Sequence, residues 1–159
     1  MTKILIVYHS RSGNTEKMAF AVAEGAKEVK GVAVELKKAD QTNLEDLLEA
    51  DGIIMGSPTY YGQMSSRLKT LIDESVKIHG KLEGKVGAAF TSSGGTATGA
   101  ETTILSIVQA MFVHGMIVQG RSGDMHYGVA AVGTPDKEET ESCKELGKRV
   151  AGLVAKLKP

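Results

Sequence analysis

A run of hydroxyl and amide side chains directly follows the first apolar segment of the chain. After residues 3–8 and His9 come Ser10, Arg11, Ser12, Gly13, Asn14 and Thr15. A helix expected from residue 15 onward would begin here with backbone N–H groups that lack acceptors and carry partial positive charge. The hydroxyls add donors, and Gly13 lets the backbone approach a ligand closely. The run predicts a phosphate-binding turn; an ordinary strand-to-helix turn with one capping hydroxyl is the alternative.

Other phosphate chemistries lack their motifs in this sequence. There is no G-x-x-x-x-G-K-[ST] run, and no G-x-G-x-x-G run follows the first apolar segment. The turn contains no cysteine, which excludes the loop nucleophile of a tyrosine phosphatase. A receiver domain would need acidic residues where this chain has His9 and Ser57.

The elements that position this turn alternate between short apolar runs and helical patterns. We expect strands at residues 3–8, 32–36, 52–56, 86–90 and 116–118, and helices at 15–29, from Asn43 through residue 48, and at 65–76, 101–114 and 138–157. Residues 121–136 are expected to form a loop with some extended structure. The alternation predicts one α/β domain over residues 1–159, a doubly wound five-stranded parallel sheet of order 2-1-3-4-5 with helices on both faces. Ligands bind such sheets at the carboxyl ends of the strands, which here places the loops 9–15, 57–64 and 91–99 together.

Composition narrows the class of protein further. With 159 residues the chain has the length of one domain, and its 19 basic and 19 acidic residues give no charge excess that would indicate nucleic acid. The single cysteine, Cys143, excludes an intramolecular disulfide and a multi-thiolate zinc site, and we expect it on the polar face of the last helix. No metal-ligand cluster stands out. No run approaches the ~20 apolar residues of a membrane span, so we expect a cytoplasmic protein without membrane insertion.

The first loop resembles the FMN phosphate loop of the flavodoxin superfamily. Its S-x-[ST]-G-N-T pattern follows the first expected strand, as in that family, and the resemblance extends over nearly the whole chain. The resemblance implies a flavodoxin-like fold with FMN as cofactor. It also implies that the FMN phosphate is wrapped by Ser10, Arg11, Ser12, Gly13, Asn14 and Thr15.

The second loop is similar to the P-T-x-[FY]-G-x-M loop of WrbA-type NAD(P)H:quinone oxidoreductases. That similarity implies contact with the flavin ring from Pro58, Thr59, Tyr60, Tyr61, Gly62 and Gln63. Adjacent tyrosines cannot both point the same way, so we expect only one of the two to stack on the ring. The family often has a basic residue at the position of Tyr60 and Asn at the position of Gln63.

The third loop resembles the S-S-T-G-x-x-x-G-Q-E loop of the same group. The resemblance implies that the flavin contacts Thr91, Ser92, Ser93, Gly94 and Gly95. Electron-carrier flavodoxins usually place an aromatic residue here to shield the ring, and this loop has none, which leaves the ring open to a small substrate.

Two further segments resemble that group and suggest a substrate face. His114 lies in an H-G-M segment that the family places near the flavin, although a histidine that interacts with a helix dipole is an equal alternative. Tyr127 lies in a segment similar to T-P-Y-G-A, which in the family approaches the flavin of a neighbouring subunit. The substrate face is accordingly expected to comprise Tyr60, His114 and Tyr127.

The resemblance implies an FMN-dependent oxidoreductase. Its expected reaction is two-electron NAD(P)H:quinone reduction, with hydride transfer through flavin N5 and no catalytic side chain. The alternative is a one-electron carrier that docks on redox partner proteins. Zero net charge argues against the alternative, because such carriers are typically acidic; a flavoprotein module in a larger system is a third reading. The apolar helix 101–114 and Tyr127 suggest a homodimer or homotetramer.

Overall fold

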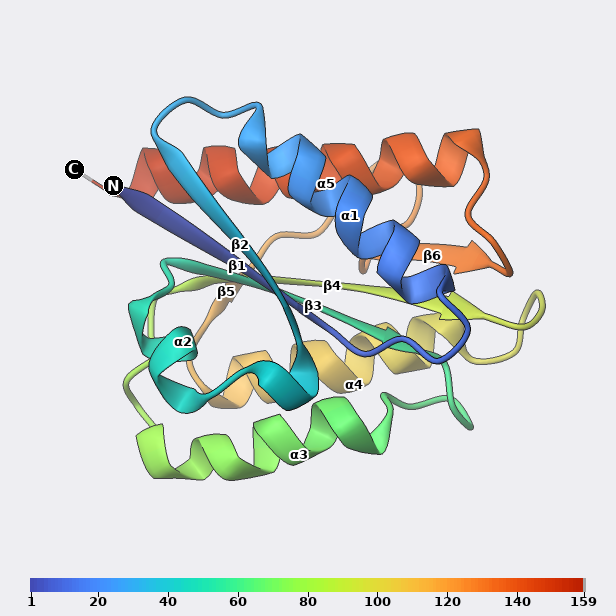
Figure 1. Ribbon diagram of the computed structural model, residues 1–159, viewed down its shortest axis with the longest axis horizontal. Coiled ribbons are helices and arrows are strands. Elements are labelled where there is room, and N and C mark those ends of the chain that lie inside the picture. Colours follow the sequence, from blue (N-terminus) through green and yellow to red (C-terminus); the bar gives the residue numbers. More distant parts are fainter. Residues whose placement is uncertain (159) are drawn as a thin grey trace.

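A parallel sheet forms the middle layer of the chain and separates two layers of helices (Figure 1). The computed structural model describes residues 1–158. Its strands are β1 (Thr2–Tyr8), β2 (Val32–Lys38), β3 (Gly52–Pro58), β4 (Val86–Ser93), β5 (Ile117–Val118) and β6 (Val129–Val132). The order β2-β1-β3-β4-β5 confirms the predicted doubly wound fold. Because the chain leaves β1 for β2 on one side and returns to β3 on the other, the loops after β1 and β3 diverge and leave a crevice between them.

Helices cover both faces of the sheet. On one face lie α1 (Asn14–Lys27) and α5 (Lys137–Leu157), and on the other lie α2 (Leu44–Glu49), α3 (Ser66–Glu74) and α4 (Ala100–Val113). The short 3-10 turns η1 (Ala39–Gln41) and η2 (Ser75–Ile78) precede α2 and follow α3. Ile4 and Ile6 of β1 face the first core, and Leu5 and Val7 face the second. Both faces of β1 are thus buried from Ile4 onward, which is why residues 4–7 are all apolar.

The edge of the sheet beside β4 is shared by two short strands, where the sequence predicted one strand and a loop. β5 pairs with Val86 and Gly87 at the start of β4, and β6 pairs in parallel with β4 from Phe90 to Ser93. The sequence predicted some extended structure within residues 121–136 but not a strand of the sheet, because four small apolar residues carry no period of their own. Pairing with β4 makes them a strand, and this pairing brings the following residue, Gly133, beside Ser93.

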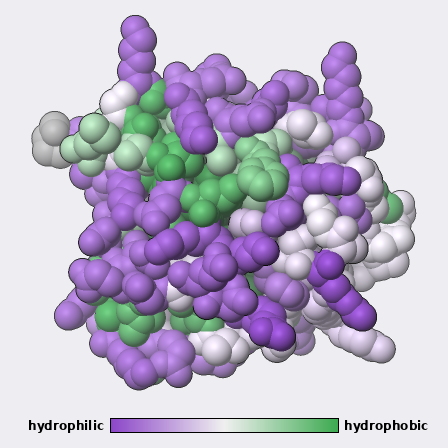
Figure 2. Space-filling model, in the orientation of Figure 1, coloured by the Kyte–Doolittle hydropathy of each residue, from purple (hydrophilic) through white to green (hydrophobic). Residues whose placement is uncertain are grey.

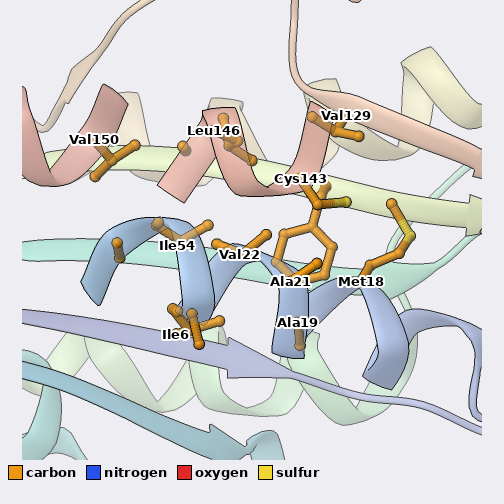
Figure 3. Packing of buried hydrophobic residues seen from close by; sticks show 14 of the residues in the cluster. Ile6, Met18, Ala19, Ala21, Val22, Ile54, Val129, Cys143, Leu146 and Val150 are labelled. Atoms are coloured by element: carbon orange, nitrogen blue, oxygen red, sulfur yellow. The ribbon is translucent and has the colours of Figure 1, made fainter. Parts of the chain in front are cut away.

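Cys143 is buried, which corrects the prediction of a surface thiol. Its side chain is 0% exposed and packs with Met18 and Val22 of α1 in the core between α5 and the sheet (Figure 3). Burial, together with the nearby Glu139 carboxylate, raises the pKa of the thiol to about 12. The polar neighbours of Cys143 in the sequence lie on other faces of α5, so local composition indicated the wrong face.

The other edge strand, β2, is protected by charged side chains. Lys3 of β1 contacts Glu35 of β2 at 2.9 Å, and Lys37 of β2 contacts Asp46 of α2 at 2.6 Å. Hydrophobic residues still reach the surface over β2 and α1 (Figure 2), where Phe20 is half exposed. Charges at an edge disfavour pairing with another strand, so these ion pairs help to keep β2 a terminal strand.

The predicted N-cap of α2 is confirmed, and it forms a reciprocal pair with Asp46. The Asp46 backbone N–H donates to Asn43 Oδ1 at 3.0 Å, and the Asn43 N–H donates to Asp46 Oδ2 at 2.9 Å. Burial acts to raise the pKa of Asp46, but the Asn43 N–H and the Lys37 ammonium outweigh it and lower that pKa. Asp46 therefore stabilises the fold in its ionised form.

Replacing Asp46 by Asn should lower the free energy of unfolding by about 1–2 kcal/mol near neutral pH. Since the folded-state pKa lies below the unfolded value, this contribution is present above about pH 4 and is lost as the pH falls further. Urea unfolding near pH 7 and near pH 3 should show the difference between the two proteins shrinking at the lower pH. Asp73→Asn, which removes an exposed partner of Lys69, is the control and should change little at either pH. If Asp46→Asn lowered the free energy of unfolding equally at both pH values, the stabilising role of the ionised Asp46 carboxylate would be contradicted.

Candidate functional site

Loops from the carboxyl ends of the strands surround a cavity of about 200 Å³. Its lining comes from four loops and consists of Arg11, Ser12, Asn14, Thr15, Pro58, Thr59, Tyr60, Ser92, Ser93, Gly94 and Gly133. This lining contains one guanidinium and no carboxylate, and most of its other side chains carry hydroxyl or amide groups. Such a donor set suits a doubly charged phosphate with a polar chain attached.

The first loop presents free backbone donors to this cavity. Gly13 lies in the left-handed region with φ of 94° and begins α1 without a side-chain cap. Within residues 1–158, the N–H groups of Asn14 and Thr15 have no hydrogen-bond acceptor. Ser10 Oγ instead accepts from the N–H groups of Gly13 and Glu16, both at 3.2 Å. The structure thus uses Ser10 to shape the turn and leaves the first N–H groups of α1 for an anion.

Thr15 and Ser92 join the first loop to the third. Their hydroxyl oxygens lie 2.8 Å apart, and the two side chains are 1% and 7% exposed. One hydroxyl hydrogen is used between them, which leaves the other hydrogen for an oxygen in the cavity. The two hydroxyls therefore form a buried hydrogen-bond donor, although Thr15 and Ser92 lie far apart in the sequence.

A tight turn in the second loop separates the two adjacent tyrosines. Tyr60 and Gln63 exchange backbone hydrogen bonds of 3.0 Å, and Tyr61 and Gly62 between them have φ values of 51° and 74°. Two successive positive φ angles are those of a type I′ turn. The turn directs Tyr60 to the cavity wall and leaves Tyr61 fully exposed. The structure thus brings one of the two tyrosines to the cavity, and Gly62 and Gln63 serve the turn.

Thr91 holds the second and third loops together below the cavity. Its hydroxyl donates to the Ser57 carbonyl oxygen at 2.6 Å and lies 2.8 Å from the Thr59 hydroxyl. The Thr59 N–H donates to the Ser92 carbonyl at 2.8 Å. Thr91 is completely buried and does not line the cavity, and its hydroxyl serves the scaffold beneath it.

The third loop touches the second through two glycines. Gly99 begins α4 with φ of 104°, and a Cβ atom on it would lie 2.7 Å from Gly62 Cα. The carbonyl of Gly95 accepts from the hydroxyls of Ser93 and Thr98, which fold the loop on itself. Gly95 therefore shapes the loop, whereas Ser93 and Gly94 line the cavity.

A fourth loop borders the cavity, and the sequence did not place it there. The Gly133 N–H donates to the Ser93 carbonyl at 2.8 Å, and the Thr134 hydroxyl donates to Asn14 Oδ1 at 3.2 Å. These residues follow β6, which was not recognised as a strand. The sequence does carry one indication of this loop: Thr134, Pro135 and Asp136 are residue types typical of a turn that leads into a helix, here the last one.

His114 does not line the cavity of its own chain, and its expected contact with the flavin stays a prediction. It follows the last residue of α4, whereas Gly99 before the first residue of α4 lies against Gly62 of the second loop, and a helix of this length spans about 20 Å. Its Nε2 lies 2.7 Å from Ser75 Oγ, and its ring centroid lies 5.9 Å from that of His79. Burial, and then the neighbouring His79, lower the pKa of His114. The contact with Ser75 thus joins the end of α4 to η2, and the lowered pKa favours the neutral form of His114.

Tyr127 is also separated from the cavity of its own chain. It lies between β5 and β6, is half exposed, and contacts the ring of His126 edge-on. Since Val129 pairs with Phe90, Tyr127 lies level with the middle of β4 rather than its carboxyl end. Of the expected substrate face, the structure brings only Tyr60 to the cavity.

Comparisons with known proteins agree on one family. Residues 2–126 match the family described as NADPH-dependent FMN reductase. The chain is 40% identical to a flavodoxin of Aquifex aeolicus, over 98% of this chain and 88% of that protein. It is 38% identical to an NAD(P)H dehydrogenase (quinone) of Archaeoglobus fulgidus, over 99% of this chain and 100% of that protein.

Solved structures give the same result. A WrbA-like flavodoxin from Agrobacterium tumefaciens superposes with a TM-score of 0.82 and 28% identity, over 99% of this chain and 100% of the other. A flavodoxin from the domain Archaea superposes with a TM-score of 0.80 and 31% identity, over 97% and 99% of the two chains. Within residues 1–158, no helix combines the length and apolar character needed to cross a membrane.

Proposed function

We propose, since this chain belongs to the NADPH-dependent FMN reductase family of flavodoxin-like proteins, that it catalyses the reduction of quinones by NAD(P)H. FMN binding and oxidoreductase chemistry follow from the family. The nicotinamide donor and the quinone acceptor are the proposed part. They are supported by relatives named NAD(P)H dehydrogenase (quinone), at 38% and 36% identity.

The residues around the cavity fit FMN. The N–H groups of Asn14 and Thr15 and the guanidinium of Arg11 would hold the phosphate, and the Thr15–Ser92 hydroxyl pair would donate to the phosphate or the ribityl chain. Tyr60 offers a planar face to the ring. When bound, FMN supplies the redox chemistry, and the protein binds it, orients it and sets its surroundings.

The observation that carries the proposed reaction is the single aromatic wall of the cavity. Tyr60 is the only aromatic residue in the lining, and residues 91–99 of the third loop contain none. A ring held against Tyr60 would therefore keep its opposite face accessible to another planar molecule. Nicotinamides and quinones are both planar and could use that face in turn.

The test is the oxidation of NADH and NADPH by the FMN-loaded protein, with and without benzoquinone. We expect oxidation of at least one nucleotide, accelerated by the quinone. Tyr60→Ala should impair the reaction, whereas Tyr61→Ala should leave it close to wild type because that side chain is fully exposed. Negligible oxidation of both nucleotides would contradict the proposal.

A one-electron carrier is the second candidate, favoured by the relative named flavodoxin at 40% identity. Zero net charge argues against it, because docking of acidic carriers on basic partners depends on a charged face. A reductive titration distinguishes the two functions. Two well-separated one-electron steps without nucleotide oxidation would support the carrier, and one two-electron step would support the reductase.

A further inference from the structure

A groove lies between the segment that follows β2 and helix α3. Its volume is about 490 Å³, and its lining includes Ala39, Asp40, Leu44, Arg67, Thr70 and Leu71. A second cavity of about 230 Å³ shares Ala39, Asp40 and Arg67 with it and adds His9 and Lys38. The two spaces therefore adjoin each other, and the larger by itself lies in the size range of small-molecule sites.

The groove begins at the wall of the cofactor cavity. His9 lines the smaller space, and its ring lies edge-on to the ring of Tyr60 with centroids 6.3 Å apart. Tyr60 in turn lines the cavity assigned to FMN. One pair of rings thus separates the two sites, and an elongated molecule could reach across their rim from one to the other.

Arg67 and Lys38 are the cations available to a ligand, because Lys77, the other cation of the groove, pairs with Glu74 in the same wall. Within residues 1–158, neither Arg67 nor Lys38 forms an ion pair. On the same helix as Arg67, by contrast, Lys69 is paired with Asp73. Exposed cations of this kind, when they converge on a concave surface, suit phosphate groups. The carboxylate of Asp40 is the one acidic group of the smaller cavity.

His9 supplies a neutral polar group at the start of the groove. Its Nδ1 lies 2.9 Å from Ser65 Oγ, which fixes the ring. Burial, and then the nearby Arg67, lower the pKa of His9 despite Asp40. His9 therefore adds a hydrogen-bonding group without adding charge, and Arg67 and Lys38 remain the cationic groups.

The far part of the groove has apolar walls. Leu44 at the start of α2 and Leu71 of α3 line it, with Ala39 and Thr70 beside them. Apolar side chains next to cations and a carboxylate match a molecule with a flat base, sugar hydroxyls and phosphates.

We infer that this groove binds the adenosine diphosphate half of NAD(P)H. The inference rests on the proposed function for its choice of nucleotide. The diphosphate lies against Arg67 and Lys38, a ribose hydroxyl donates to Asp40, and the adenine lies between Leu44 and Leu71. The nicotinamide half then extends past Tyr60 to the open face of the ring.

The direct test is calorimetric titration of ADP into the FMN-loaded protein and two variants. Arg67→Gln should weaken ADP binding by about tenfold or more, since a hydrogen bond to a charged group is lost. Thr70→Trp, which fills the groove from an exposed position, should abolish binding by an independent route. Lys69→Gln, on the same helix but outside the groove, is the matched control and should bind ADP like the wild type.

Steady-state kinetics then measure how the reaction rate depends on the concentration of NAD(P)H and, separately, on that of benzoquinone. Arg67→Gln should raise KM for NAD(P)H while FMN affinity and KM for benzoquinone stay unchanged. No binding of ADP to the wild type, or equal binding by Arg67→Gln and Lys69→Gln, would overturn the inference. If NAD(P)H is not oxidised but ADP binding is lost in Arg67→Gln, the groove is upheld as an adenylate site and only the proposed donor fails.

Discussion

Replacing Gly147 by alanine should lower the free energy of unfolding by about 2–3 kcal/mol, even though alanine favours helices. Gly147 lies where α5 crosses α1, and a Cβ atom there would lie 1.9 Å from the Val22 carbonyl oxygen. The reciprocal position on α1, Gly25, would place a Cβ atom 1.8 Å from the Lys144 carbonyl. Both obstacles are backbone atoms, so the helices must separate. Thermal unfolding with saturating FMN should show a decrease of about 5–10 °C in Tm.

The same helix provides the matched control. A Cβ atom on Gly152 of α5 would meet no neighbouring element within 4 Å, so Gly152→Ala should gain helix propensity and stabilise the protein by about 0.5–1 kcal/mol. The two substitutions are chemically identical and lie on one helix. Opposite changes in the free energy of unfolding would therefore report the close approach of α1 at Gly147. If Gly147→Ala proved as stable as Gly152→Ala, the close approach of α1 and α5 would be wrong.

Replacing Thr15 by valine should weaken FMN binding by about ten- to hundredfold, because a hydrogen bond from a buried hydroxyl to a charged group is lost. Valine keeps the shape of the side chain but removes both the link to Ser92 and the hydrogen left for the ligand. Fluorescence titration of the apoprotein with FMN measures the effect.

Thr15→Ser is the control for this prediction, since it keeps the hydroxyl and should retain most of the affinity. Ser10→Ala tests a different role: its oxygen holds the turn through the Gly13 and Glu16 N–H groups, so the loss should appear in stability as well as in affinity. Unchanged FMN affinity in both Thr15→Val and Ser10→Ala would refute the phosphate assignment of the first loop.

Features that depend only on residues close together in the chain were predictable from the sequence. Residues 4–7 are apolar on both faces because this part of β1 is buried on both faces, and Asn43 caps α2 because its side chain can reach the N–H of Asp46. The free N–H groups at the start of α1 follow from the same local physics, since a strand that runs through a glycine turn into a helix leaves its first N–H groups without acceptors.

Features that depend on distance between segments were not predictable. His114 has the sequence context of a flavin contact, yet a helix of 14 residues carries it to the other end of the sheet. Thr91 belongs to the third loop by sequence, but its hydroxyl is taken up by Ser57 and Thr59. Gly133 and Thr134 join the site only because β6 pairs with β4.

By itself, the sequence determined the order of the first five strands and of the five helices, the doubly wound sheet and the glycine turn that begins α1, because periodicity, capping and backbone freedom act over a few residues. Only the tertiary structure decided which tyrosine faces the cavity, that Cys143 is buried, and that Arg67 and Lys38 border a groove beside Tyr60. Those outcomes depend on packing between segments that are distant in the chain, and no local pattern encodes such distances.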